Sequence, residues 1–498
     1  MRKIVFVFVA LVAASVAVAG EFKAGFARVD ITPPLGSFMP GYYVDRRAKE
    51  VLDPLQINCV AFSDGKETAI IQQYDTEGIS DAVANRLRDA IAKATGVKRD
   101  AIIVHASHTH DGGFLAQDAD HGSSASDDGV PSTATEIDRL YSAFCVTRAA
   151  DAAVQAIADL KPAKLSVGRS VAKRISFGRR YLMKNGKVRT NPGTNNPDIV
   201  KPVGNPPDEE VQVLRIDREG GKAIAVINFQ THPDVVGGET LTADWPGLTR
   251  GVFEAATFGD AEAIVLNGTQ GDVNHCNVMP KPGELNGLKR DFDDVDRGYD
   301  HAKHMANVIA GAALSVWMKC APLEAGAIRF GVENVKVPSQ KAKATDEKNL
   351  AWAEDVWALH EKSDKDGVAG GEKDYVTKKY GWTGMELTTE VARAGRIRRL
   401  ANGPDTFEIP ITSIAIGRAV AFAGFPGEPF NDIGKAVKKA SPFGVTLLSC
   451  LSNGSRGYFP FSDAFKEGGY ESATSPFGPS VADDLIAGEL KLLNRLCK

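Results

Sequence analysis

AIIVHASHTHDGG, residues 101–113, joins an apolar run to three of the nine histidines of the chain and then to paired glycines. The apolar run predicts a buried β-strand, and the polar residues after it predict the end of that strand. Imidazoles at His108 and His110 of an extended segment point to the same side. They either coat a polar edge or gather a metal ion, because neutral histidine is both a common ligand and a common surface group.

Strand-like and helical segments alternate on both sides of this stretch. A helix is expected over 80–96, with Ser80 as its cap and Gly96 as its end, and other helices over 136–160 and after 244–247. Strands are expected near 26–31, 57–62, 67–75, 212–217, 222–232, 262–272, 415–429 and 445–461. This alternation predicts an α/β fold, in which a mixed sheet is flanked by helices and a metal site lies at the carboxyl ends of strands.

The start of the chain is typical of a secretory signal peptide. Met1-Arg2-Lys3 precedes a short apolar run that closes on small residues, so we expect cleavage after residue 19 and a secreted or periplasmic protein. No later segment is long and apolar enough to span a bilayer. We expect residues 20–498 to form a single domain.

Composition excludes several classes of protein. The chain is 43% hydrophobic and 24% charged, which is ordinary for a globular protein, and its net charge of −4 gives no reason to expect nucleic acid as a partner. Its six cysteines are scattered, with Cys320 and Cys497 as candidates for one late disulfide.

Residues 341–399 are rich in Lys, Glu, Asp and Gly, and we expect them to form a charged helical surface insertion.

Unusual polar residues recur where the predicted strands end. They are His108, His110, His232, Asp272, Asn274, Glu428 and Tyr458. Ligands of open α/β sheets bind beyond the carboxyl ends of strands, so this recurrence predicts a site there. The chain lacks the G-x-S-x-G elbow of serine hydrolases, and "GTQGD" lacks the Lys-Ser/Thr ending of a phosphate-binding loop. Two histidines, a carboxylate and an open position instead favour a hydrolytic zinc site.

Taken together, these segments resemble the catalytic domain of the neutral, non-lysosomal ceramidase family. The similar segments are "GFARVDITPPLG", "SHTHDGG", "FQTHPD", "NGTQGDVN", "FPGEPF" and "GYFPFSDAFKEGGYES", in the family's order from about Gly25 to Glu471. The resemblance implies zinc bound by His108, His232, Glu428 and Tyr458. It also implies His110 as general base, with Tyr470 and an arginine of "FGRRYL" near the scissile carbonyl; we favour Arg180 over Arg179.

The chain departs from the family's pattern in several places. Asp-Gly-Gly follows the histidine pair where the family has Ser-Gly-Pro, the insertion has no counterpart, and we expect no C-terminal immunoglobulin-like domain. The expected activity is hydrolysis of an N-acyl amide, in ceramide or a related lipid, by zinc-activated water. One alternative is a zinc hydrolase of another amide or ester, such as an N-acylated sugar, and a second is a catalytically silent exported binding protein.

Overall fold

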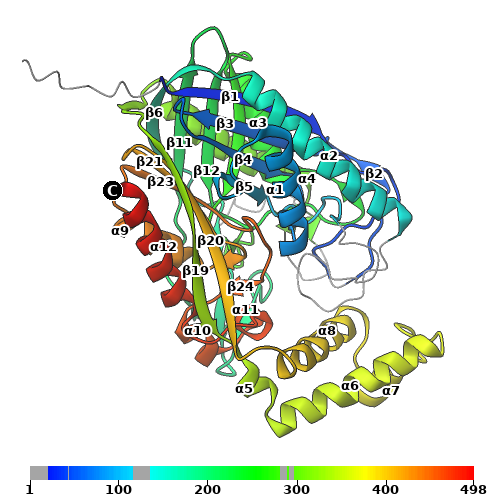
Figure 1. The fold of residues 1–498 in the computed structure, drawn as a ribbon. Helices are drawn as coiled ribbons and strands as arrows, with labels where there is room; N and C mark the ends of the chain where they lie inside the picture. Colours follow the sequence, from blue (N-terminus) through cyan, green and yellow to red (C-terminus); the bar gives the residue numbers. More distant parts are fainter. Residues whose placement is uncertain (1–20, 43, 116–134, 281–288, 291–295) are drawn as a thin grey trace, which may run out of the picture.

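The computed structural model describes residues 21–42, 44–115, 135–280, 289–290 and 296–498, and its largest element is a mixed sheet (Figure 1). Along the sheet the strands are β14 (Ala261–Asn267), β12 (Ala223–Phe229), β11 (Glu210–Arg218), β6 (Lys161–Val171), β1 (Lys23–Asp30), β3 (Gln56–Ser63), β4 (Thr68–Tyr74) and β5 (Ile102–Ala106), with β18 (Ala321–Leu323) paired to β6. The pairs β12/β14 and β4/β5 are parallel, and the other pairs are antiparallel. The sheet is therefore mixed, as predicted.

Two pairs of helices cover this sheet. The helices α1 (Asp81–Thr95) and α2 (Glu136–Ala158) pack together, and α2 lies on β1 and β3. The second pair, α3 (Asp244–Ala256) and α4 (Tyr299–Trp317), packs on β14, β11 and β6. The Ser80 side chain accepts a hydrogen bond from Val83 N, and Gly96 ends α1 in the left-handed conformation, so the predicted cap and end of this helix are confirmed.

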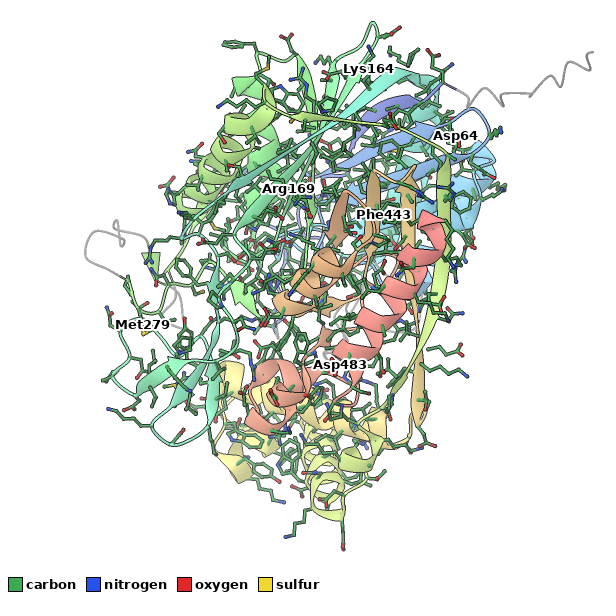
Figure 2. All side chains as sticks on the ribbon, turned by 90° about the vertical axis from the view of Figure 1, so that its left-hand side faces the viewer. Asp64, Lys164, Arg169, Met279, Phe443 and Asp483 are labelled. Atoms are coloured by element: carbon green, nitrogen blue, oxygen red, sulfur yellow. The ribbon has the colours of Figure 1, made fainter. Side chains whose placement is uncertain are left out.

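A second, four-stranded sheet packs beside the first. Its order is β19 (Ile328–Pro338), β20 (Thr406–Ile416), β21 (Val420–Gly424) and β23 (Val445–Ser449), and only β21 and β23 are parallel. The helix α12 (Val481–Cys497), which carries Asp483 in its first turn, runs along β19 and β20, and α9 (Asn431–Ala440) packs against α12 (Figure 2). Buried Ile, Val, Leu and Phe side chains fill the space between them.

The charged insertion forms helices that project from the two sheets (Figure 1). They are α5 (Lys341–Ala344), α6 (Glu347–Lys365), α7 (Tyr375–Tyr380) and α8 (Gly384–Ala401). A small apolar core of its own, which includes Ala353, Val356 and Leu387, holds α6, α7 and α8 together.

The short elements of the fold are a 3₁₀ turn (Arg99–Ala101), β2 (Glu50–Val51), β7 (Phe177–Gly178), β8 (Arg180–Met183), β9 (Val188–Thr190), β10 (Ile199–Pro202), β13 (Thr240–Leu241), β15 (Val273–Asn274), β16 (Lys289–Arg290), β17 (Asp296–Arg297), β22 (Glu428–Pro429), β24 (Tyr458–Phe459), α10 (Ser462–Glu467) and α11 (Tyr470–Thr474).

The carboxyl ends of strands from both sheets meet at one place. Asn267, the last residue of β14, donates a backbone hydrogen bond to the His105 ring in β5 and accepts one from Cys450 N, just after β23. The Asn267 side chain also donates to Ser107 O. Asn453, from the same segment as Cys450, bonds to the backbone of Val104 in β5. These bonds bring β5, β14 and β23 together, so the segments that follow them share one region.

The structure also decides other expectations. The predicted fold class is confirmed. All six cysteines are free, so the candidate disulfide between Cys320 and Cys497 is wrong. Among the described helices, none combines the length and the apolar character needed to cross a membrane. The predicted signal peptide, residues 1–19, lies outside the described residues.

Candidate metal and active site

His108 lies two residues beyond the end of β5, in a backbone conformation that non-glycine residues rarely adopt. Its φ is 74°, in the left-handed region, so the expectation of an extended segment through His108 and His110 is wrong. Two bonds to the segment after β4 hold it there: His108 N donates to Thr76 O at 3.0 Å, and His108 Nδ1 lies 2.6 Å from Glu77 O. A carbonyl oxygen only accepts, so Nδ1 carries the proton and the lone pair of Nε2 faces the site.

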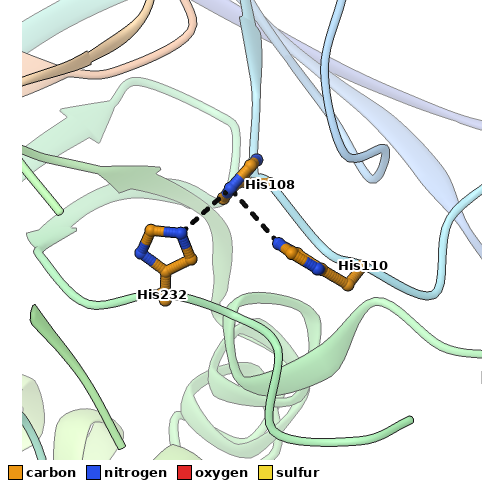
Figure 3. Close-up of side chains that lie close together, drawn as sticks. All are labelled: His108, His110 and His232. Atoms are coloured by element: carbon orange, nitrogen blue, oxygen red, sulfur yellow. Dashed lines mark hydrogen bonds between the residues drawn. The ribbon is translucent and has the colours of Figure 1, made fainter. Parts of the chain in front are cut away.

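His232 follows β12 and is oriented in the same way. Its Nδ1 lies 2.9 Å from Gln270 O, in the segment after the neighbouring strand β14. This carbonyl again fixes the proton on Nδ1 and leaves the lone pair of Nε2 available. The two Nε2 atoms of His108 and His232 are 3.3 Å apart, and both rings are buried (Figure 3). Metal-binding histidines characteristically donate their other ring nitrogen to a carbonyl in this manner.

Glu428 and Tyr458 are brought together by a short parallel strand pair. In the register of β22 and β24 their Cα atoms are direct partners. Glu428 Oε2 lies 3.3 Å from His108 Nε2 and 3.1 Å from His232 Nε2. Burial acts to raise the pKa of the Glu428 carboxyl, but the adjacent His108 and His232 outweigh burial and hold that pKa well below its usual range. Glu428 is therefore an ionised carboxylate beside the two imidazole rings.

These three atoms form a triangle of the size that a tetrahedral metal ion requires. Its sides are 3.3 Å between His108 and His232, 3.3 Å between His108 and Glu428, and 3.1 Å between His232 and Glu428. Zinc lies about 2.0–2.1 Å from nitrogen and oxygen ligands, so two ligand atoms of a tetrahedral site are about 3.3–3.4 Å apart. The donor set and its spacing therefore fit a zinc ion.

His110 belongs to the same cluster. Its Nε2 is 3.3 Å from His108 Nε2, and one ring nitrogen from each of His108, His110 and His232 falls within 4.8 Å of the others (Figure 3). Residues i and i+2 of an extended strand are about 6.5 Å apart along the chain, so the left-handed turn at His108 is what brings the two rings together. Burial lowers the pKa of His110 well below its usual value. The described histidine cluster could hold a metal ion.

Gly41 closes one side of the His110 ring. This glycine has a φ of 102°, and a Cβ atom there would lie only 2.7 Å from His110 Nδ1. The ring of Tyr42 meets the His110 ring edge-on, with the centroids 5.4 Å apart. Close packing by Gly41 and by the Tyr42 ring holds the His110 ring with its Nε2 toward His108.

Arg179 lies against Tyr458 of the cluster and Arg180 against Phe430, and both guanidinium groups contact Glu471. The Arg179 guanidinium is 5.4 Å from the centroid of the Tyr458 ring and donates from Nε to Glu471 Oε1 at 2.8 Å. Arg180 packs over Phe430 and forms part of the wall of a separate cavity. This placement does not support the preference for Arg180 over Arg179.

Tyr470 completes the wall of a cavity at the cluster. The centroids of the Tyr470 and Tyr458 rings are 5.6 Å apart. Both rings, with His108, His110 and Glu428, line a space of about 30 Å³. The structure thus brings together all of the predicted site residues except Arg180.

The sequence analysis missed the residues that orient the cluster. Glu77 and Gln270 hold the two imidazoles through their carbonyl oxygens, and the Gln270 side chain donates to Glu428 Oε2 at 3.2 Å. Glu77 directly follows a predicted strand and Gln270 lies in the polar end of another, which was the available signal. Asp272, by contrast, accepts a hydrogen bond from Asn431 N at the start of α9, so it supports the Glu428 segment from outside.

Comparison with known proteins supports the fold. No protein-family profile matches the sequence, and no curated protein sequence matches it. Among solved structures, neutral ceramidase from Pseudomonas aeruginosa superposes with a TM-score of 0.67 over 96% of this chain and 75% of that chain, at 17% identity. A ceramidase complexed with C2 gives the same TM-score over 96% of this chain and 76% of that one, also at 17% identity. The predicted resemblance is confirmed in the fold: this chain has the fold of neutral ceramidase.

Proposed function

We propose that this chain is an exported zinc-dependent amidohydrolase that cleaves the N-acyl amide bond of ceramide or a related N-acyl lipid. The observation that carries the proposal is the triangle of His108 Nε2, His232 Nε2 and Glu428 Oε2, with sides of 3.1–3.3 Å. Two imidazoles and one carboxylate are a familiar donor set of hydrolytic zinc enzymes. The ceramidase fold around the triangle supports an amide as the substrate.

His108, His232, Glu428 and Tyr458 are the proposed zinc ligands. A zinc ion held there supplies a water molecule of lowered pKa and withdraws electron density from a carbonyl group. His108 and His232 present fixed lone pairs because Glu77 O and Gln270 O hold the opposite ring nitrogens.

His110 is the proposed general base. Its pKa is lowered by burial, so the ring is neutral at neutral pH and can accept a proton from the attacking water. The same ring then returns the proton to the departing amine. His110 also lies within the histidine cluster. A His110 variant that loses zinc would identify this residue as a ligand, whereas a variant that keeps zinc and loses hydrolysis would identify it as the base.

Tyr470 and Arg179 are proposed to stabilise the negative charge that develops on the carbonyl oxygen. Tyr470 lines the cavity at the cluster, and Arg179 approaches the cluster through Tyr458. Burial lowers the pKa of Arg179, but Tyr458 and Glu471 outweigh burial and raise it well above its usual value. The side chain therefore carries a permanent positive charge in a buried place, where such a charge acts strongly.

The test is to measure zinc content and fatty-acid release together. Wild-type protein is expected to hold about one zinc ion per chain and to release fatty acid from an N-acyl lipid. His108→Ala and His232→Ala are expected to lose both. His304→Ala removes an exposed histidine of α4 and serves as the matched control. Full zinc content in both site variants would contradict the ligand assignment, and zinc without any hydrolysis would favour the silent binding protein.

A further inference from the structure

The charged insertion and the body of the protein form a further cavity next to the histidine cluster. It has a volume of about 530 Å³, within the range of small-molecule sites. α5 and α8 form one side, and β20 with the 473–477 segment forms the other. This cavity exists only because the insertion folds against the body.

Positive charge dominates the wall of this cavity. Five basic residues line it: Lys343, Arg393, Arg396, Arg399 and Arg456. Asp81 is the single acidic residue among its described lining residues, and it pairs with Arg456 at 2.5 Å. Glu390, outside the wall, pairs with Arg393 at 3.1 Å. Such a concentration of like charge in a concave, partly apolar site attracts an anionic ligand.

The same cavity also has an apolar side. Ile397, Leu400, Phe407 and Phe477 line it together with the basic residues. A ligand that fills this space therefore gains from both apolar contact and negative charge. An amphiphile with an anionic group satisfies both requirements.

The basic cavity reaches the proposed catalytic centre. Arg456, Thr474 and Pro476 line both this cavity and the small one at the histidine cluster. The helix α11 runs from Tyr470 at the small cavity to Thr474 at the boundary, a rise of about 6 Å. A molecule whose amide lies at the cluster would thus place its neighbouring groups among the basic residues.

We infer that the preferred substrate is an N-acyl amide bearing an anionic group, a carboxylate or a phosphate, close to the amide bond. The insertion, through Lys343 and the arginines of α8, selects this substrate over uncharged N-acyl amides. The inference rests on the proposed amide hydrolysis and narrows its substrate class.

The experiment compares three lipids that share one acyl chain and differ in the amine part. N-lauroylethanolamine is neutral, N-lauroylglycine carries a carboxylate, and N-lauroyl-phosphoethanolamine carries a phosphate. Values of kcat/KM are measured for the full-length enzyme and for the double variant Lys343→Gln/Arg399→Gln, whose two side chains are exposed and whose fold is thereby expected to survive. Lys348→Gln/Lys373→Gln removes two exposed lysines of the same insertion outside the cavity and is the matched control.

The wild type and the control are expected to prefer at least one anionic lipid over the neutral lipid by tenfold or more. In the cavity variant this preference ratio is expected to fall by about 10-fold, as for two partly exposed charge contacts. Added salt is expected to reduce the wild-type ratio, because the Debye length shrinks from about 10 Å at 0.1 M to about 3 Å at 1 M. Whether carboxylate or phosphate gives the larger ratio identifies the anionic group.

Two results would overturn the inference, and they differ in what they say about the proposed function. If the neutral lipid is hydrolysed as well as both anionic lipids, the proposed function stands and the charge selection is wrong. If none of the three is hydrolysed and binding of N-lauroylglycine, measured by calorimetry, is equal in the wild type and the cavity variant, both are wrong.

Discussion

Glu428→Gln tests the proposed metal centre most directly, because it removes one negative charge and keeps the shape of the side chain. Glu428 Oε2 lies 3.3 Å from His108 Nε2, 3.1 Å from His232 Nε2 and 3.2 Å from Gln270 Nε2. An amide in this place is a poor zinc ligand. Zinc binding by four protein ligands is worth about 10–16 kcal/mol, so one ligand accounts for about 3–4 kcal/mol. The expected loss of zinc affinity is therefore about 10²–10³-fold.

Gln270→Leu provides a graded comparison. It removes the hydrogen bond to Glu428 and a long one to Cys450 Sγ, and it keeps the bond to His232, which comes from the backbone oxygen of Gln270. Loss of a hydrogen bond that orients a ligand is expected to weaken zinc binding by about 10–100-fold.

The assay is competition for zinc against a chromophoric chelator, with thermal unfolding measured beside it. His304→Ala is the control and is expected to bind zinc as the wild type does. The reasoning is refuted if Glu428→Gln binds zinc within threefold of the wild type, or if Gln270→Leu loses more affinity than Glu428→Gln.

Three further predictions concern the chemical step and the stability of the fold. His110→Ala is expected to keep its zinc and to lose about 10²–10⁴-fold in kcat, measured by fatty-acid release; normal turnover would remove the base assignment. Tyr458→Phe is expected to weaken zinc retention, whereas Tyr470→Phe keeps zinc and loses about 2–4 kcal/mol of transition-state stabilisation in kcat rather than KM; an effect on KM alone would make Tyr470 a substrate contact. Glu489 is buried in α12 beside Ser413, and burial raises the pKa of its carboxyl from 4.5 to about 8. The folded state then binds a proton that the unfolded state has lost, so the free energy of unfolding falls as pH rises from about 4.5 to about 8, by at most about 5 kcal/mol. Glu489→Gln is expected to flatten this dependence in chemical-denaturation curves, and an unchanged pH profile would show that Glu489 is not its source.

The sequence by itself determined many of the strands, several of the helices and most of the candidate site, but it did not predict β6, β19 or most of β20. The buried run 102–106 and the helix between Ser80 and Gly96 are local patterns, in which neighbouring residues fix the structure through periodicity and capping. The same local patterns placed His108, His232, Glu428 and Tyr458 at strand ends, because polar residues after an apolar run mark the end of a buried strand.

Only the tertiary structure decided how these strand ends meet. The left-handed turn at His108 depends on hydrogen bonds to the Thr76–Glu77 segment, which no pattern within 101–113 encodes. The tertiary structure also decides which arginine lies beside the cluster. Arg179 and Arg180 both contact Glu471, but only Arg179 packs on the ring of Tyr458, whereas Arg180 packs on Phe430.

The basic cavity is the clearest case of what the sequence alone could not show. Residues 341–399 read as a solvated surface because a charge run carries no information about what it faces. The cavity requires α8 to lie beside the 473–477 segment, which is more than 70 positions later in the sequence. Apolar periodicity and helix capping depend on neighbouring residues, so a sequence can predict them. The charge in a cavity comes from segments that are far apart in the sequence, and only the folded chain brings those segments together.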